Sequence, residues 1–180
     1  MLAQTGTYTG NLTDNRAITG IGFEPSLVII KGDTSERAVF KTASMSGDTS
    51  FQFATGSLAA NFIQSLDSDG FTIGTSAKVN SNSITYYYVA IRRETNDPDF
   101  NYGTYTGDGT DDRNITGVGF QPTLVIIKGD TSSDIGNFFD NNDDDSTGSH
   151  LIGGSPVPNT IQALQSDGFQ IGSAAGINSS

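Results

Sequence analysis

The chain has 180 residues, with 22 glycines, one histidine, no cysteine and no tryptophan, and its formal net charge is −11. The absence of cysteine excludes a disulfide framework, a zinc–thiolate site and a thiol nucleophile. The excess of acidic residues argues against nucleic-acid binding, and no apolar run is long enough to span a membrane. Residues 1–6 show neither the basic nor the apolar segment of a secretory signal. We therefore expect a soluble acidic protein that binds neither nucleic acid nor a membrane.

Short apolar runs separated by glycine-rich turns predict an almost wholly β structure with no helix longer than a turn. The runs expected to form strands are Gly6–Gly10, Ile18–Phe23, Leu27–Lys31, Phe51–Phe53, Ile63–Leu66, Phe71–Ile73 and residues 84–91. Leu27–Lys31 is continuously apolar up to its lysine, which is typical of a strand buried on both faces. Phe51–Phe53 is expected at a sheet edge. The Asp69-Gly70 pair predicts a hairpin between the strands that flank it.

The chain repeats itself at a spacing of about 97 residues. Residues 6–34 and 103–131 differ at seven of 29 positions, which leaves 22 identical, and Ile63–Gly74 resembles Ile161–Gly172. This period exceeds that of solenoid repeats and indicates tandem duplication of a small domain. The predicted fold class is all-β, with tandem jelly-roll-like β-sandwiches. The predicted domains are a first repeat at 1–93, a linker at 94–102 and a second repeat at 103–180.

The second copy has no counterpart of the tyrosine-rich strand of the first. Residues 84–93 read ITYYYVAIRR, whereas the second copy stops at Ser180, where that strand is expected to begin. A sandwich that lacks a central strand exposes apolar surface and unpaired backbone groups. Two explanations remain open: the chain is a fragment of a longer protein, or a strand from another subunit fills the gap, as in donor-strand complementation.

Candidate chemical sites are few. Asp140, Asp143 and Asp145 lie in the densest acidic stretch, where a calcium site and a solvated surface loop are the two alternatives. His150 is the single histidine, no activated-serine motif accompanies it, and the first copy has none, so we expect no catalytic role for it. The acidic residues are 17 aspartates, mostly in turns, and three glutamates, which does not favour a glycosidase carboxylate pair. The sequence predicts no catalytic residue and no cofactor, with Ca²⁺ left open at the acidic stretch.

Tyrosines and repeated basic residues supply the remaining candidates. Tyr86, Tyr87 and Tyr88 place rings on both faces of one strand, where they form a ligand or interface surface, or fill the core on one face. Four basic residues recur in both copies and are expected to pair with nearby aspartates: Arg16, Arg113, Lys31 and Lys128.

Four blocks of the first copy carry a family resemblance: GTYTGN, GFEPSLVIIKGDT, SLDSDGFTIG and ITYYYVAI. With these blocks the sequence resembles a small β-rich repeat domain of bacteriophage tail-fibre and other virion structural proteins. The first copy departs from the family pattern at Leu12, where the family usually has glycine, and the second copy matches the first three blocks. The resemblance implies a fold and a setting in the virion, and it carries over no catalytic residue.

The expected function is that of a non-enzymatic virion structural protein, assembled in the host cytoplasm without an export signal. It would be an exposed capsid decoration (cement) or tail-fibre component that assembles through β-edges and loops with other virion proteins, as a homo-oligomer. One alternative is a carbohydrate-binding or adhesion module that recognises a host-surface glycan. Another is an extracellular filament subunit joined by donor strands.

Overall fold

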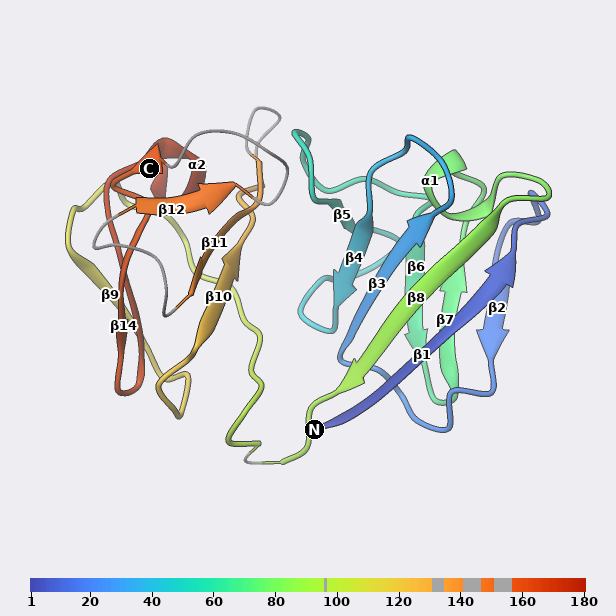
Figure 1. Ribbon diagram of the computed structural model, residues 1–180, viewed down its shortest axis with the longest axis horizontal. Coiled ribbons are helices and arrows are strands. Elements are labelled where there is room, and N and C mark those ends of the chain that lie inside the picture. The colour runs from blue at the N-terminus through green and yellow to red at the C-terminus, as the bar shows by residue number, and fades with distance from the viewer. Residues whose placement is uncertain (96, 131–134, 141–146, 151–156) are drawn as a thin grey trace. The chain divides into compact units, whose positions relative to one another are not determined.

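The computed structural model describes residues 1–95, 97–130, 135–140, 147–150 and 157–180, with the backbone alone at 147–150. The chain divides into two compact units, one of Met1–Gln52 with Leu58–Asp97 and the other of Phe53–Ser57 with Pro98–Ser180. Antiparallel strands dominate both units, and each of the two described helices is four residues long (Figure 1). The predicted all-β, sandwich-type fold class is confirmed.

The first unit is a sandwich of a five-stranded and a three-stranded sheet. The larger sheet has the order β1-β8-β3-β4-β5 and the smaller one β2-β7-β6. The elements are β1 Leu2–Thr9, β2 Arg16–Thr19, β3 Leu27–Gly32, β4 Val39–Thr42, β5 Phe51–Gln52, β6 Ile63–Asp67, β7 Gly70–Ile73, α1 Ala77–Asn80 and β8 Thr85–Arg92. The predicted Phe51–Phe53 edge strand is present as β5, and the predicted hairpin is β6–β7.

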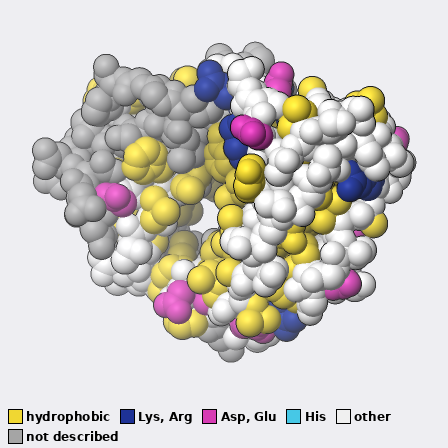
Figure 2. All heavy atoms as spheres, turned by 45° about the vertical axis from the view of Figure 1, so that its right-hand side comes forward, with side chains coloured by type: hydrophobic (Ala, Val, Ile, Leu, Met, Phe, Trp, Pro, Cys, Tyr) yellow, Lys and Arg dark blue, Asp and Glu magenta, His cyan; other side chains and the backbone are white. Residues whose placement is uncertain are grey.

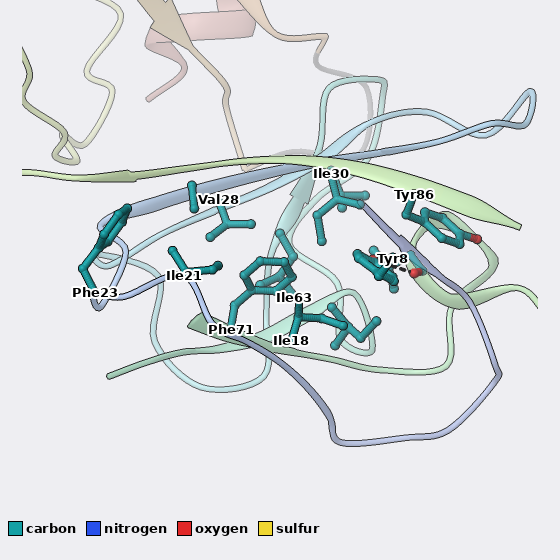
Figure 3. Close-up of a cluster of buried hydrophobic side chains, with 13 residues drawn as sticks. Tyr8, Ile18, Ile21, Phe23, Val28, Ile30, Ile63, Phe71 and Tyr86 are labelled. Carbon is teal, nitrogen blue, oxygen red and sulfur yellow. Dashed lines mark hydrogen bonds between the residues drawn. The ribbon is translucent and has the colours of Figure 1, made fainter. Parts of the chain in front are cut away.

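The core of the first unit lies between these two sheets (Figure 3). Ile30 and Tyr86 enter it from the larger sheet, and Phe71 and Ile73 from the smaller one, all with 0% exposure. Because side chains alternate between the two faces of a strand, every second residue of these strands faces this core. The burial of the alternate positions holds the two sheets together.

Three predicted strands differ from the structure, the first being β1, which begins at Leu2 rather than Gly6. β2 ends at Thr19 rather than Phe23, because Gly20 and Gly22 both have φ +85, a left-handed conformation that does not continue a strand. β3 is not buried evenly on both faces: Val28 and Ile30 are fully buried, whereas the alternate residues of the strand are half-buried or exposed. The side chains of β3 therefore alternate between buried and more exposed positions, although the sequence of the strand is continuously apolar up to Lys31.

The second unit has a four-stranded sheet in the order β10-β11-β12-β13 and a three-stranded sheet in the order β14-β15-β9. Its elements are β9 Arg113–Thr116, β10 Leu124–Ile127, β11 Asn137–Asp140, β12 Thr147–His150, β13 Val157–Pro158, β14 Ile161–Gln165, β15 Gly168–Ile171 and α2 Ala175–Asn178. Val125, Ile127 and Phe139 pack with Ile161 and Ile171 in its core.

The larger sheets of the two units differ at one edge. β10 has the sequence position of β3, which in the first unit pairs with β8. The part of the second unit that the structure describes contains no counterpart of β8, so β10 is the edge strand of its sheet. Residues 103–106 correspond to the second half of β1 and are not in a strand, and the described residues contain no strand with which they would pair as β1 pairs with β8.

Candidate functional site

The three consecutive tyrosines of β8 have different surroundings. Tyr86 is fully buried, its hydroxyl donates to the Ala77 carbonyl at 2.6 Å, and its ring stacks on Tyr8 with centroids 5.3 Å apart. Tyr88 is half-buried and meets Phe71 edge to face at 5.2 Å. Tyr87 points to the opposite face of the sheet and is 54% exposed. Two of the rings therefore belong to the core, and Tyr87 alone is placed to contact a partner.

The predicted calcium ligands are largely outside the described residues. Asp140 is the last residue of β11, whereas Asp143 and Asp145 are not described. The backbone of His150 ends β12 opposite Asn137, and its side chain is outside the description. Among the described residues, no group of three or more metal-ligating side chains comes together. The calcium site therefore stays a prediction.

Arg16 does not pair with its neighbour Asp14 as expected. Its guanidinium lies over the Tyr8 ring, 5.4 Å from the centroid, and Nη1 donates to the Thr9 carbonyl at 2.6 Å. A planar guanidinium can stack on a ring and donate to a carbonyl at the same time, and this geometry replaces the predicted ion pair. The Asp14 carboxylate instead accepts from the Gln64 amide at 3.0 Å.

Arg113 repeats this arrangement in the second unit. It lies over the Tyr105 ring at 5.6 Å, donates to the Thr106 carbonyl at 2.6 Å and forms an ion pair with Asp108 at 3.4 Å. The carboxylate partner is thus Asp108 rather than Asp111, its nearer neighbour in the chain. The residue corresponding to Asp108 in the first copy is Asn11, so the ion pair is specific to the second unit.

The two repeated lysines bind main-chain oxygens. Lys31 Nζ donates to the carbonyls of Gly32 and Thr34, the latter at 2.7 Å. Lys128 Nζ donates to the carbonyl of Gly129 at 2.5 Å. Both lysines therefore help to hold the loop that follows their strand. The sequence analysis, which expected them to pair with aspartates, did not predict this role.

A buried asparagine connects three segments of the first unit. Asn80 is 0% exposed, and its Oδ1 accepts from the Asn11 amide at 2.9 Å. Its Nδ2 donates to the carbonyls of Thr13 at 2.7 Å and Gly74 at 3.0 Å. Because each of these polar groups is paired, the hydrogen bonds offset the cost of removing the amide from water.

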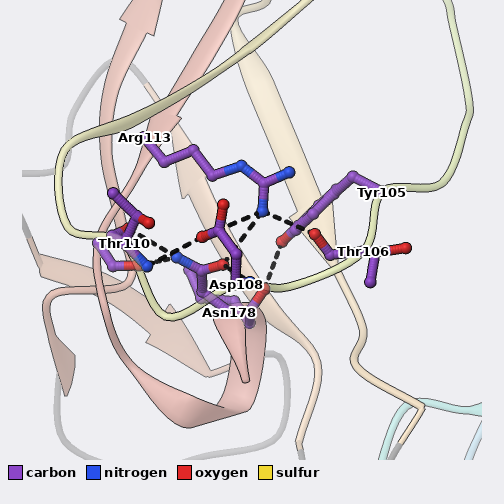
Figure 4. Close-up of polar contacts among 8 residues, drawn as sticks. Tyr105, Thr106, Asp108, Thr110, Arg113 and Asn178 are labelled. Carbon is purple, nitrogen blue, oxygen red and sulfur yellow. Dashed lines mark hydrogen bonds and ion pairs between the residues drawn. The ribbon is translucent and has the colours of Figure 1, made fainter. Parts of the chain in front are cut away.

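The second unit has the same arrangement around Asn178, also 0% exposed (Figure 4). Its Oδ1 accepts from the Asp108 amide at 3.0 Å, and its Nδ2 donates to the carbonyls of Thr110 at 2.8 Å and Gly172 at 2.9 Å. Sequence reasoning missed both asparagines. The signal that could have found them is the repetition of Asn-Ser after an apolar residue, at Asn80 and Asn178.

Hairpin aspartates hold the glycine-rich loop of each unit. The Asp69 carboxylate accepts from the amides of Gly22 at 2.6 Å and Gly20 at 3.0 Å. Asp167 does the same in the second unit, with the amides of Gly119 at 2.7 Å and Gly117 at 3.1 Å. Two hydrogen bonds lower the pKa of Asp69 below its ordinary value: the one from Gly22 has the larger effect and the one from Gly20 the smaller.

This lowered pKa predicts an acid-dependent loss of stability. An aspartate that is more acidic in the folded state contributes stability above its unfolded pKa of about 3.9, and this contribution is lost as the pH falls through the folded pKa. We expect the urea midpoint of Asp69→Asn to depend less on pH below pH 4 than that of the wild type. Asp33→Asn, at an exposed aspartate, is the matched control for the removal of one negative charge. Equal slopes for wild type and Asp69→Asn would contradict the assignment.

Large apolar side chains lie on the outer surface of edge strand β10. Val125 and Ile127 point into the core, while the alternate residues Leu124 and Ile126 are 52% and 45% exposed. Phe138 of β11 pairs with Ile126 and shares its face, since directly opposed residues of an antiparallel pair lie on the same side. Figure 2 shows further hydrophobic side chains at the surface of the molecule, with charged side chains scattered among them. Large contiguous apolar patches on a surface are typical of interaction sites.

The first unit corresponds to one known family. The profile of a family described as Domain of unknown function (DUF7483) matches residues 2–98, which include every strand from β1 to β8. The chain belongs to this family. No curated protein and no solved structure matches it. Among the described residues, no helix is long and apolar enough to cross a membrane.

Proposed function

We propose that this chain is a non-enzymatic structural protein of a bacteriophage particle, exposed on it as a capsid decoration or tail-fibre component. Its partners are other virion proteins and further copies of itself, and its contacts are made by sheet surfaces. The resemblance of its four sequence blocks to virion repeat domains supports the setting. The observation that carries the proposal is the outer surface of β10, where Leu124 and Ile126 are exposed.

An exposed apolar row on an edge strand is unfavourable for an isolated soluble domain. Antiparallel sheets that face water usually alternate apolar residues inward with polar residues outward. Natural edge strands are usually shortened, charged or covered, because an open edge pairs with other strands. β10, an edge strand among the described residues, instead presents Leu124 and Ile126 outward, which suits a surface that packs against another protein.

Variants of β10 test this proposal. The double substitution Leu124→Ser with Ile126→Ser removes the apolar row while leaving the inward residues unchanged. Leu12→Gly is the matched control, since Leu12 is 56% exposed, belongs to the first unit and has φ +63, which glycine adopts readily. We expect the wild type and the control to purify with intact particles at a fixed stoichiometry, and the double variant to be reduced at least tenfold. Equal incorporation of all three proteins, or none of the wild type in particles, would refute the proposal.

Glycan binding is the second candidate, and the exposure of Tyr87 favours it. Its ring is 54% exposed on the outer face of the five-stranded sheet, opposite Thr7 of β1 and Lys31 of β3. An exposed aromatic ring can stack on the face of a sugar, while polar side chains beside the ring form hydrogen bonds with the hydroxyl groups of the sugar. Saturable binding to a polysaccharide of the host surface, lost in Tyr87→Ala, would support this function. Absence of binding to every glycan of such a panel would exclude it.

A further inference from the structure

The outer face of the five-stranded sheet carries apolar side chains. On neighbouring strands β8 and β3, Val89 lies opposite Ile29 and Ile91 lies opposite Leu27 (Figure 1). Because directly opposed residues share a face and side chains alternate along a strand, these four lie on the same side as Tyr87. All four are half-buried and lie outside the core cluster of the unit. We call them the first outer face, an apolar surface where antiparallel sheets usually turn polar residues to water.

The second unit repeats part of this surface. Leu124 and Ile126 of β10 correspond to Leu27 and Ile29 of β3, and they are 52% and 45% exposed. Asp140 of β11 lies opposite Leu124 and therefore shares its face. We call these three residues of the second unit the second outer face. A further strand paired with β10 would extend the sheet in its own plane, so this face does not depend on what lies beside β10.

The two units differ strongly in charge. Residues 1–97 contain seven basic and nine acidic residues, whereas residues 98–180 contain two basic and eleven acidic ones. The five strands of the larger sheet in the first unit contain no aspartate or glutamate, and Lys31 lies beside Tyr87 on its outer side. The second outer face includes the carboxylate of Asp140. Charge therefore favours contact between the two different faces over contact between two acidic second units.

We propose that the first outer face of one molecule packs against the second outer face of a second copy of the chain. The contact removes apolar side chains of both faces from water. It joins two different surfaces, so each molecule keeps one face of each kind for further neighbours, and repetition builds a ring or an open fibre. This inference rests on the proposed assembly role, because it names the partner that the exposed residues of β10 contact.

The molar mass of the purified chain in solution tests this contact. Light scattering after size-exclusion chromatography measures the mass as the protein concentration rises from about 1 to about 100 μM, since association between copies follows mass action. We expect the mass to rise from that of the monomer to that of the dimer and of larger species. A monomer at every concentration would overturn the proposal, whether the two faces then cover each other within one chain or stay exposed.

Two double variants each disable one face. Ile29→Thr with Val89→Thr removes apolar surface from the first outer face and keeps β-branched residues in its strands. Leu124→Ser with Ile126→Ser does the same on the second outer face. We expect each variant alone to associate at least tenfold more weakly than the wild type. An equimolar mixture of the two is expected to form a dimer with wild-type affinity, because each variant supplies the face that the other lacks.

The controls separate loss of the contact from loss of the fold. Leu12→Gly, at an exposed position in a loop of the first unit, is expected to associate as the wild type does. Circular dichroism melting measures the fold of each variant. If the variant at Ile29 and Val89 unfolds, the single substitution Ile91→Thr replaces it in the same mixture.

Other contacts give different results. If the variant of the first outer face associates as the wild type does, the second outer face has another partner surface and the proposal is wrong. A mixture of two folded variants that stays monomeric would also overturn it. Self-association of a chain that never enters particles would refute the particle role and leave this contact supported. Incorporation into particles without self-association would refute the contact alone.

Discussion

Replacing Phe71 with alanine is expected to lower the free energy of unfolding of the first unit by about 4 kcal/mol. Phe71 is 0% exposed and lies in the core between the two sheets (Figure 3). Its ring makes edge contacts with Tyr8 at 6.5 Å and Tyr88 at 5.2 Å. The truncation therefore removes apolar burial and two aromatic contacts, and leaves a cavity that the sheets cannot fill without moving.

The second unit provides the matched comparison for this variant. Phe169 corresponds to Phe71 but is only half-buried, in a unit whose described residues include no counterpart of Tyr88. Phe169→Ala is expected to lower the free energy of unfolding of the second unit by about half as much as Phe71→Ala lowers that of the first, because less buried apolar surface is lost. Urea unfolding followed by circular dichroism, with hydrogen exchange to assign each transition to its unit, measures both changes. Equal losses at the two positions would contradict the description of the second core as less complete.

Asn80→Ala is expected to destabilise the first unit by about 3 kcal/mol, because three buried or half-buried main-chain groups lose their partner. These groups are the Asn11 amide and the carbonyls of Thr13 and Gly74. They belong to the loop before β2 and to the residue after β7, whereas Asn80 ends α1, so the side chain connects segments that are remote in the sequence.

Asn82→Ala is the control for this variant, since Asn82 is exposed two residues further along the chain. It is expected to change the unfolding free energy by less than about 0.5 kcal/mol. Asn178→Ala is expected to destabilise the second unit to a similar extent as Asn80→Ala does the first, since the bonds around it are the same. Urea midpoints assigned to each unit by hydrogen exchange measure the effect. A loss at Asn80 no larger than that at Asn82 would refute the role of the buried amide.

The local strand signals of the first unit were sufficient to predict most of its strands, because they depend on neighbouring residues. The apolar run at Leu27, the hairpin at Asp69-Gly70 and the tyrosine-rich run at Tyr86 each appear as strands or turns in the structure. The end of β2 was predicted wrongly, since the burial of Ile21 and Phe23 outside any strand depends on loop geometry. The partners of Arg16 were missed for a related reason: Tyr8 and Thr9 are brought to it by the fold.

The sequence by itself determined that the chain is acidic and β-rich, that it repeats one unit, and that residues 103–180 contain no match to the tyrosine-rich run at 84–93. These properties follow from composition, alternation and internal comparison, which need no coordinates. Only the tertiary structure decided which of the three tyrosines faces outward. It also decided that Asn80 and Asn178 each connect segments within their own unit, and that Leu124 and Ile126 of edge strand β10 are exposed. The reason is physical: burial and hydrogen bonding depend on which strands pair, and pairing joins residues that are far apart in the chain.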